Sequence, residues 1–216
     1  MTRSKRLLDL VLLALMAPAL LPLLGLLCLV LWAAQGRPIF YGAERMRSVT
    51  EGFTLWKLRS MTGAARDSGV SGGDKAGRIT PMGRRLRRVR LDEVPQMLNI
   101  LRGDISFVGP RPPLREYVER FPAIYEHVLR ARPGVTGLAS LVYAGHETLL
   151  LARCTTPEET DAVYARACVP RKARLDLIYQ RHQSVGFDLW LVAVTAARVF
   201  GLAKGRRLPR PPLSGS

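Results

Sequence analysis

The longest hydrophobic run of the chain extends from Leu10 to Ala34 without a charged residue. As a helix it would be about 37 Å long, which exceeds the roughly 30 Å of a bilayer core. Pro18 and Pro22 lie within the run, and each removes a backbone donor, so we expect a break near the middle of the helix. Both flanks are basic, with Arg3, Lys5 and Arg6 before the run and Arg37, Arg45 and Arg47 after it.

The two basic flanks indicate whether this helix crosses the membrane or returns to the side from which it entered. Because positive charge prefers the cytoplasmic side, a helix that enters the bilayer, breaks and leaves by the same face would satisfy both ends. The pattern therefore predicts a re-entrant membrane helix over residues 1–36, with a plain transmembrane anchor as the alternative. Asp9 lies beside Lys5 and Arg6, and we expect an ion pair between Arg6 and Asp9 to anchor the helix start.

Shorter hydrophobic patterns predict one domain over residues 37–203. Residues 38–47 and 53–61, around a turn at 50–52, predict a β-hairpin near the membrane. Apolar stripes at helical spacing predict helices that begin near residues 92, 114, 156, 170 and 187, and the last is too short to span a bilayer. The expected fold class is α+β and predominantly helical, with interfacial amphipathic helices.

Two segments lack an apolar pattern. Residues 63–77 are rich in Gly, Ser and Asp and predict a loop, which is interpreted either as a lid over an active site or as a linker. Residues 204–216 are basic and proline-rich, and we expect this tail to be disordered.

The charge balance narrows the choice of partners. The chain has 33 Lys and Arg against 17 Asp and Glu, a formal net charge of +16. Such an excess implies nucleic acid, an acidic membrane surface or a phosphorylated small molecule. The hydrophobic run favours the last two, so nucleic acid is not the expected partner. The three cysteines form no Cys-x-x-Cys pair, which argues against a disulfide framework or a zinc site.

Two adjacent carboxylates, Asp92 and Glu93, are the strongest candidates for chemistry. Pro95 suits the first turn of a helix and Gly103 the residue after its end, so the carboxylates are expected at a helix N-terminus. There the unpaired N–H groups and the helix dipole favour anions. The pair is interpreted either as a nucleophile or metal site, or as the acidic cap of an ordinary surface helix.

The arginines before this pair suit an anionic substrate. A helix would place Arg84, Arg87 and Arg88 on one face. One or two of these guanidinium groups could bind a diphosphate, and the others would face solvent or lipid headgroups.

A second candidate phosphate site is the loop around Arg111. Pro110 and Pro112 restrain the backbone on both sides of this arginine, and a rigid loop suits phosphate recognition. A structural ion pair with Asp104 or Glu116 is the alternative.

Eight motifs extend these observations over nearly the whole chain. They are Lys5-Arg6-Leu7-Leu8-Asp9, Pro22, Lys57-Leu58-Arg59-Ser60-Met61, Arg78-Ile79-Thr80, Leu91-Asp92-Glu93-Val94-Pro95-Gln96, residues 103–112, residues 132–137, and the spacing of Asp176, Tyr179 and Asp188. In their order and spacing they resemble the bacterial sugar transferases, specifically the small monotopic phosphoglycosyl transferases. The lack of extra spans before residue 10 resembles the small form of the family.

This resemblance implies a transfer reaction. A sugar-1-phosphate would pass from a UDP-sugar to undecaprenyl phosphate through a covalent aspartyl-phosphosugar intermediate, which initiates assembly of a capsule, exopolysaccharide, O-antigen or glycoprotein glycan. The resemblance also implies Mg²⁺ and a location at the bacterial inner membrane, in contact with membrane lipids and with the catalytic domain on the cytosolic face. A homodimer is among the expected assemblies.

The resemblance further implies roles for individual residues. Asp92 would be the nucleophile and Glu93 the main Mg²⁺ ligand, with Asp92 as the second. The expected phosphate-binding residues are Lys57, Arg59, Arg87 and Arg111.

The chain departs from the family pattern at Leu21, at Arg47 and at Leu138-Ala139-Ser140, where Trp-Ala-Gln is usual. The last change lies in a region associated with donor recognition, so the donor sugar is not predicted. Two other functions stay open, which are a membrane-anchored nucleic-acid-binding protein, motivated by the charge, and a non-catalytic scaffold for glycan-assembly enzymes.

Overall fold

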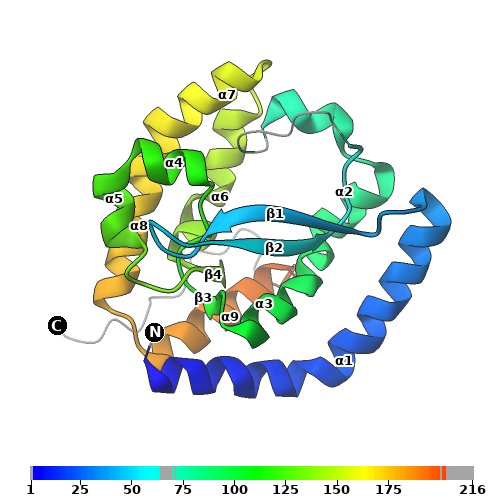
Figure 1. Ribbon diagram of the computed structural model, residues 1–216, viewed down its shortest axis with the longest axis horizontal. Helices are drawn as coiled ribbons and strands as arrows, with labels where there is room; N and C mark the ends of the chain where they lie inside the picture. The colour runs from blue at the N-terminus through cyan, green and yellow to red at the C-terminus, as the bar shows by residue number, and fades with distance from the viewer. Residues whose placement is uncertain (1, 64–69, 71, 200, 203–216) are drawn as a thin grey trace.

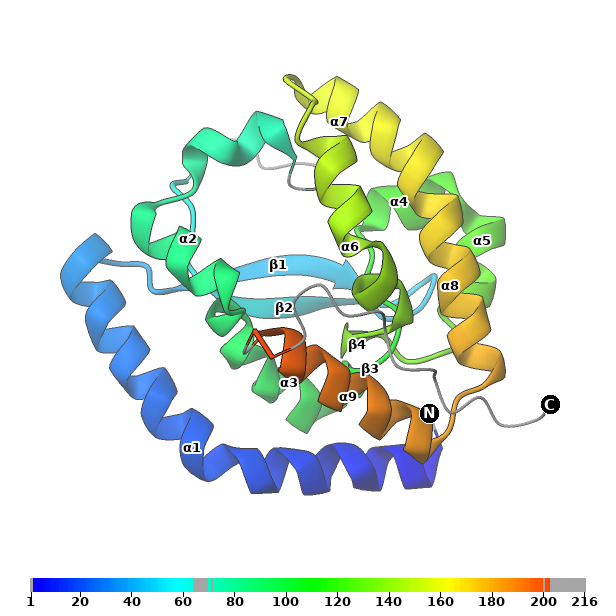
Figure 2. The same cartoon turned by 180° about the vertical axis from the view of Figure 1, so that it is seen from behind.

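The computed structural model describes residues 2–63, 70, 72–199 and 201–202. Figure 1 shows a helical body with a β-hairpin across its middle and a long N-terminal helix along two of its sides. Figure 2 shows the same body from behind. The predicted class, predominantly helical with a short antiparallel hairpin, is confirmed. The predicted tail, 204–216, lies outside the described residues, as do residues 64–69 and 71 of the predicted loop.

The long helix α1 (Arg3–Gln35) contains both prolines that were expected to break it. The helix continues through them, but Figures 1 and 2 show its axis turning near the middle. A kink is the expected result where prolines remove backbone donors. By length and composition α1 could cross a membrane, and it is the one such helix in the described part of the chain.

Both halves of α1 pack on the same body. Leu13 in the first half is buried in a cluster with Met97, and Leu31 in the second half is buried against Leu58. The other side of the helix is exposed and apolar, and includes Leu7, Val11, Leu15, Leu21, Leu26, Leu29 and Trp32. A contiguous apolar surface of this kind marks contact with lipid or with another protein.

Polar contacts hold the start of α1, but they are not the predicted ones. The predicted ion pair between Arg6 and Asp9 is wrong, because each side chain has other partners. Arg6 donates to the carbonyl oxygens of Ile100 and Leu101, at 2.5 and 2.7 Å. Both carbonyls lie in the last turn of α3 (Met97–Arg102), and a cation is favoured at a helix C-terminus. Asp9 Oδ1 instead accepts hydrogen bonds from the Ser106 hydroxyl at 2.9 Å and from a backbone N–H at 3.0 Å.

Lys5 makes the ion pair that anchors this end of the helix. Its Nζ lies 2.6 Å from Oδ2 of Asp188 and 3.0 Å from the hydroxyl oxygen of Tyr179. The Tyr179 hydroxyl also donates to Oδ1 of Asp188, at 2.6 Å. All three residues are at most 3% exposed. The N-terminal helix is therefore joined to the last two helices by a buried charged cluster.

The predicted β-hairpin is confirmed. β1 (Phe40–Met46) pairs antiparallel with β2 (Gly52–Leu58), with Phe40 opposite Leu58 and Met46 opposite Gly52. Ala43 and Met46 of β1 and Leu55 and Leu58 of β2 are its buried residues. Lys57, near the end of β2, lines a cavity between the hairpin and the helices.

The chain then reaches the carboxylates through four short helices. These are the 3-10 helix η1 (Gly73–Arg78), α2 (Pro81–Arg88), the 3-10 helix η2 (Leu91–Gln96) and α3 (Met97–Arg102). η1 was not predicted, because its residues belong to the segment expected to be a loop. Arg90 has a φ of 56°, which ends α2 and turns the chain into η2. The helix predicted at Asp92 therefore begins as a 3-10 turn and becomes α-helical at Met97.

The rest of the body is built from helices and one pair of very short strands. β3 (Ser106–Val108) and β4 (Gly134–Thr136) are parallel, and neither was predicted, because three residues are too few to show an alternating pattern. The helices are α4 (Arg115–Arg120), α5 (Pro122–Val128), α6 (Leu138–Leu151), α7 (Pro157–Val163), the π-helix η3 (Tyr164–Cys168), α8 (Val169–Arg181) and α9 (Val185–Val199). α6 was not predicted, whereas the start of α7 was. There Thr156 accepts a hydrogen bond from the N–H of Glu159 at 3.1 Å.

Candidate active site

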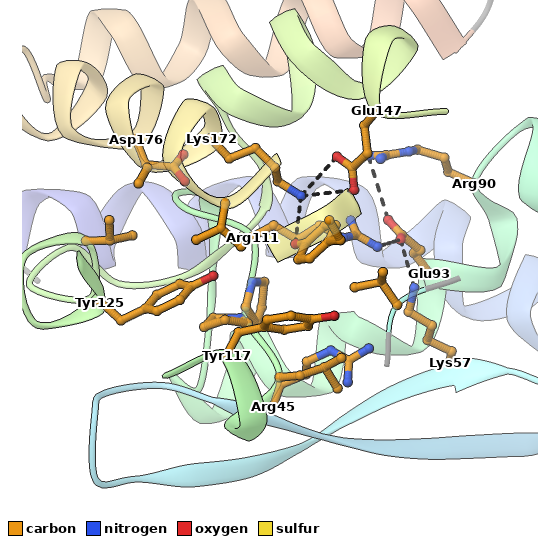
Figure 3. Close-up of a pocket in the computed structure, with 18 of the residues that line it drawn as sticks. Arg45, Lys57, Arg90, Glu93, Arg111, Tyr117, Tyr125, Glu147, Lys172 and Asp176 are labelled. Atoms are coloured by element: carbon orange, nitrogen blue, oxygen red, sulfur yellow. Dashed lines mark hydrogen bonds and ion pairs between the residues drawn. The ribbon is translucent and has the colours of Figure 1, made fainter. Parts of the chain in front are cut away.

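Asp92 and Glu93 line a cavity of about 340 Å³. Figure 3 shows this cavity with Glu93 at one end. The cavity lies between β2, η2, the loop after β3, and helices α6 and α8. Both carboxylates are at most 9% exposed, and both come from the first turn of η2. The left-handed turn at Arg90 directs this first turn toward the cavity. A pair of acids at this position is therefore no ordinary surface cap.

Glu93 is surrounded by cations. Its Oε1 lies 3.0 Å from Nζ of Lys57 and 3.1 Å from a guanidinium nitrogen of Arg111, and its Oε2 lies 3.8 Å from Arg90. Burial raises the pKa of Glu93, but the charges of Arg111, Lys57 and Arg90 outweigh burial and hold the pKa well below its usual range. Glu93 is therefore ionised at every physiological pH. Its Oε2 has no hydrogen-bond partner among the described residues.

Asp92 differs from its neighbour in having free lone pairs. No described residue donates a hydrogen bond to its carboxylate, although the side chain is 5% exposed in total. Burial raises the pKa of Asp92, and Lys57 and Arg87 only partly offset this effect. A carboxylate that is desolvated and unpaired is the more reactive of the two as a nucleophile.

The structure brings three of the four predicted phosphate ligands to this cavity. Lys57 comes from β2, Arg87 from α2 and Arg111 from the proline-restrained loop. Nε of Arg87 donates to the Ser60 hydroxyl at 2.8 Å, which holds the guanidinium against the site. The alternative partners of Arg111, Asp104 and Glu116, are not used, because its carboxylate is Glu93. Burial lowers the pKa of Lys57, while the charge of Glu93 opposes that shift.

Arg59 does not line the cavity. Its guanidinium donates to the carbonyl oxygens of Gln35, Gly36 and Arg37 at the end of α1. Cations are favoured at a helix C-terminus, and these carbonyls are unpaired within the helix. The residue predicted to bind phosphate therefore joins α1 to β2.

Sequence patterns missed the far wall of the cavity. Nζ of Lys172 lies 3.0 and 3.2 Å from the two oxygens of Glu147 and 3.2 Å from the Tyr164 hydroxyl. Asp176 and Tyr125 lie beyond them (Figure 3). Asp176 belongs to the motif spacing noted above. No signal marked Glu147 or Lys172, because they are 25 residues apart on two helices that meet only in the fold.

The residues present suit a magnesium ion that takes some of its ligands from the protein and the others from a bound substrate. The described residues contain no cluster of three or more Asp, Glu, His or Cys able to hold a metal ion. Mg²⁺, however, is commonly bound by one or two carboxylates together with phosphate oxygens and water. The unpaired lone pairs of Asp92 and the unpartnered Oε2 of Glu93 provide such a pair.

Replacing Asp176 by asparagine should stabilise the protein at alkaline pH. Burial raises the pKa of this carboxyl from 3.8 to about 7, with Lys172 opposing. For an acid whose folded-state pKa is raised, stability is unaffected below the unfolded pKa, falls as the pH rises from the unfolded pKa to the folded one, and is constant above it. At about 1.4 kcal/mol per unit, the gain in unfolding free energy for Asp176→Asn should be roughly 3 kcal/mol larger at pH 8 than at pH 5. Denaturant unfolding in micelles at both pH values measures this difference, and an equal gain at both would contradict it.

Among the described residues, one helix is long and apolar enough to cross a membrane, and the cavity beside Asp92 is lined by Lys57, Arg87, Arg90 and Arg111, whose charge suits an anionic ligand. Residues 1–202 match the bacterial sugar transferase family, and the chain belongs to that family.

Named relatives are similar over most of the chain. A UDP-glucose:undecaprenyl-phosphate glucose-1-phosphate transferase of Caulobacter vibrioides is 37% identical over 74% of this chain and 62% of its own length. A transferase of the same name from Escherichia coli is 30% identical over 91% of this chain and 40% of its own length. A UDP-N-acetylgalactosamine-undecaprenyl-phosphate N-acetylgalactosaminephosphotransferase of Aeromonas hydrophila is 30% identical over 64% of this chain and 34% of its own length. The chain thus spans about a third to three-fifths of these relatives.

Proposed function

We propose that the protein transfers a sugar-1-phosphate from a UDP-sugar to undecaprenyl phosphate and so initiates the assembly of a glycoconjugate. The observation that carries the proposal is the contrast between the two carboxylates. Glu93 is held ionised by Lys57 and Arg111, while Asp92 beside it has no hydrogen-bond donor. Relatives from three bacteria are named as transferases that use undecaprenyl phosphate.

In the first step a carboxylate oxygen of Asp92 attacks the phosphorus that carries the sugar. The bond between this phosphorus and the bridging oxygen breaks, and UMP leaves with the electron pair. The product is an acyl phosphate that links Asp92 to the sugar phosphate. Lys57, Arg87 and Arg111 line the same cavity as Asp92, and their positive charges stabilise the charge on the phosphoryl oxygens.

In the second step a phosphate oxygen of undecaprenyl phosphate attacks the same phosphorus. The bond to Asp92 breaks, the carboxylate is regenerated, and the sugar becomes attached to the lipid through a diphosphate. Asp92 and Glu93 are the residues that would hold Mg²⁺ together with the donor phosphates. The ion, when bound, supplies charge neutralisation at the phosphoryl oxygens.

The reaction is tested directly by transfer from radiolabelled UDP-sugars. Purified protein in nanodiscs would receive undecaprenyl phosphate, Mg²⁺ and one donor at a time from a panel. At least one donor should give a labelled lipid product. With the acceptor omitted, about one equivalent of UMP per chain should still be released, because the first step does not need the lipid. No product from any donor would overturn the proposal.

We further propose that α1 is re-entrant and that the body lies on the cytosolic face of the inner membrane. The support is the packing of both halves of α1 on one body, since a helix that crosses a bilayer can contact a body on one side with one half alone. The outward apolar face would then contact lipid.

The arrangement is tested by cysteine labelling at Ser4, which is exposed in the first turn of α1, and at Thr50, in the turn of the hairpin. Cys28, Cys154 and Cys168 would first be replaced by serine or alanine. An impermeant maleimide should label both new cysteines in inverted membrane vesicles and neither in intact spheroplasts. Labelling of the two sites from opposite sides would show that α1 spans the membrane.

A further inference from the structure

Two cavities meet at the arginines of the site. The second cavity, of about 680 Å³, lies between η1, α2 and helices α6 and α8. The two cavities share five of their lining residues, which are Arg87, Arg90, Arg111, Glu147 and Lys172. The carboxylates Asp92 and Glu93 line only the first cavity. A diphosphate bound by the shared arginines would therefore have one cavity on each side.

The chemistry of the transfer assigns a different part of the donor to each cavity. In a phosphoryl displacement the attacking and leaving oxygens lie roughly in line on opposite sides of the phosphorus. Because Asp92 attacks from the first cavity, the leaving nucleotide must lie away from it, toward the second cavity. The sugar stays on the attacked phosphorus through an oxygen that is equatorial to the line of attack. The first cavity extends from Asp92 to Asp176 and has the space for it.

The end of the first cavity opposite Glu93 offers unpaired polar groups (Figure 3). Asp176 is 6% exposed, and its Oδ1 has no hydrogen-bond partner among the described residues. The Tyr125 hydroxyl likewise makes no hydrogen bond to any described residue, although the side chain is 8% exposed. A buried polar atom without a partner costs free energy in the absence of a ligand. Such groups mark a place where a ligand forms the missing hydrogen bonds.

The ion pair of Lys172 with Glu147 completes this end. Lys172 is fixed by Glu147 and by the Tyr164 hydroxyl, so its ammonium group has a defined position. Two carboxylates and one ammonium give this end a net negative charge when Asp176 is ionised. Carboxylates accept hydrogen bonds from sugar hydroxyls, whereas a carboxylate on the sugar itself would be repelled.

We infer that Asp176, Tyr125 and the Lys172–Glu147 pair form the sugar subsite, and that they select an uncharged, hydroxyl-bearing sugar over a uronic acid. The inference rests on the proposed function, since it uses Asp92 as the nucleophile. These residues touch the sugar and determine which donor is used. Asp176 and Tyr125 line the first cavity but not the second, so they take no part in binding the nucleotide.

The test compares donors in competition on Asp176→Asn and on Arg174→Gln. Arg174 is exposed on the same helix and outside this cavity, so it is the matched control. The wild type should use one of UDP-glucose, UDP-galactose or UDP-N-acetylglucosamine and reject UDP-glucuronic acid. Asp176→Asn should change the ratio of kcat/KM between the best two neutral donors by about tenfold or more, because a lost hydrogen bond to a specific hydroxyl alters discrimination by that order.

The inhibition constant of UMP serves as the control for folding. A variant that folds poorly would bind UMP more weakly as well. This constant should stay within about twofold of the wild-type value in both variants, since the nucleotide lies in the other cavity. An unchanged donor ratio in Asp176→Asn, or a UMP constant that weakens as much as the donor ratio changes, would overturn the inference. Failure of the proposed function is a different result, because the wild type would then transfer from no donor.

Discussion

Asp92→Asn should abolish transfer, with a loss of more than about 10³-fold in kcat. Asparagine keeps the size of the side chain but cannot form the acyl phosphate. The side chain accepts no hydrogen bond from the described residues, so its replacement should not disturb the fold. The measurement is transfer from the best donor of the panel, together with labelling of the protein when the acceptor is left out. The wild type should retain radiolabelled sugar phosphate on the chain, and Asp92→Asn should retain none.

Glu158→Gln is the control for this substitution. Glu158 lies exposed in the first turn of α7, away from the cavity, and the exchange also converts a carboxylate to an amide. This variant should transfer at the wild-type rate. If Asp92→Asn transferred at a comparable rate, another nucleophile or a single displacement would have to replace the two-step scheme.

Lys5→Met should lower the free energy of unfolding by about 3–5 kcal/mol. The substitution removes the one cation that lies 2.6 Å from Asp188 and leaves a carboxylate that is 2% exposed without its counter-charge. The Tyr179 hydroxyl still donates to Asp188, but a single neutral hydrogen bond does not replace the ion pair. Unfolding by sodium dodecyl sulfate in mixed micelles, followed by tryptophan fluorescence, measures the loss.

A double variant separates the ion pair from the rest of the contact. Lys5→Met combined with Asp188→Leu removes both charges, and replacing a buried pair by apolar residues is often neutral. The double variant should therefore recover most of the stability lost in Lys5→Met. If the single and double variants were equally unstable, packing of the lysine stem rather than its charge would hold α1 to α9.

Some contacts of the site could be predicted from neighbouring residues. Pro95 and Gly103 mark the two ends of a short helix, and this places Asp92 and Glu93 at its N-terminus. The signal depends only on residues close in the sequence. Arg111 was identified because prolines on both sides restrain it. In each case the signal lies within a few residues of the side chain it concerns.

Other contacts could not be predicted, because they join residues far apart in the chain. The ion pair of Lys5 with Asp188 was missed for this reason, and Arg6 and Asp9 were paired wrongly. Opposite charges three residues apart on a helix suggest a pair. In the fold, however, Arg6 donates to carbonyls at the C-terminal end of α3, and Asp9 accepts hydrogen bonds from Ser106 and from the N–H of Phe107 in β3. Arg59 was assigned to phosphate although it binds carbonyls of α1, since a basic residue in a motif carries no information on where its guanidinium reaches.

By itself the sequence determined the kinked hydrophobic helix, the hairpin, the starts of several helices and the acid pair among arginines. All of these depend on periodicity, on proline and glycine geometry or on adjacent residues. Only the tertiary structure decided which cation holds which carboxylate and that Glu147, Lys172 and Asp176 face Asp92 across one cavity. Those relations depend on the packing of α6 and α8 against η2, and no local pattern encodes the distance between side chains on separate elements.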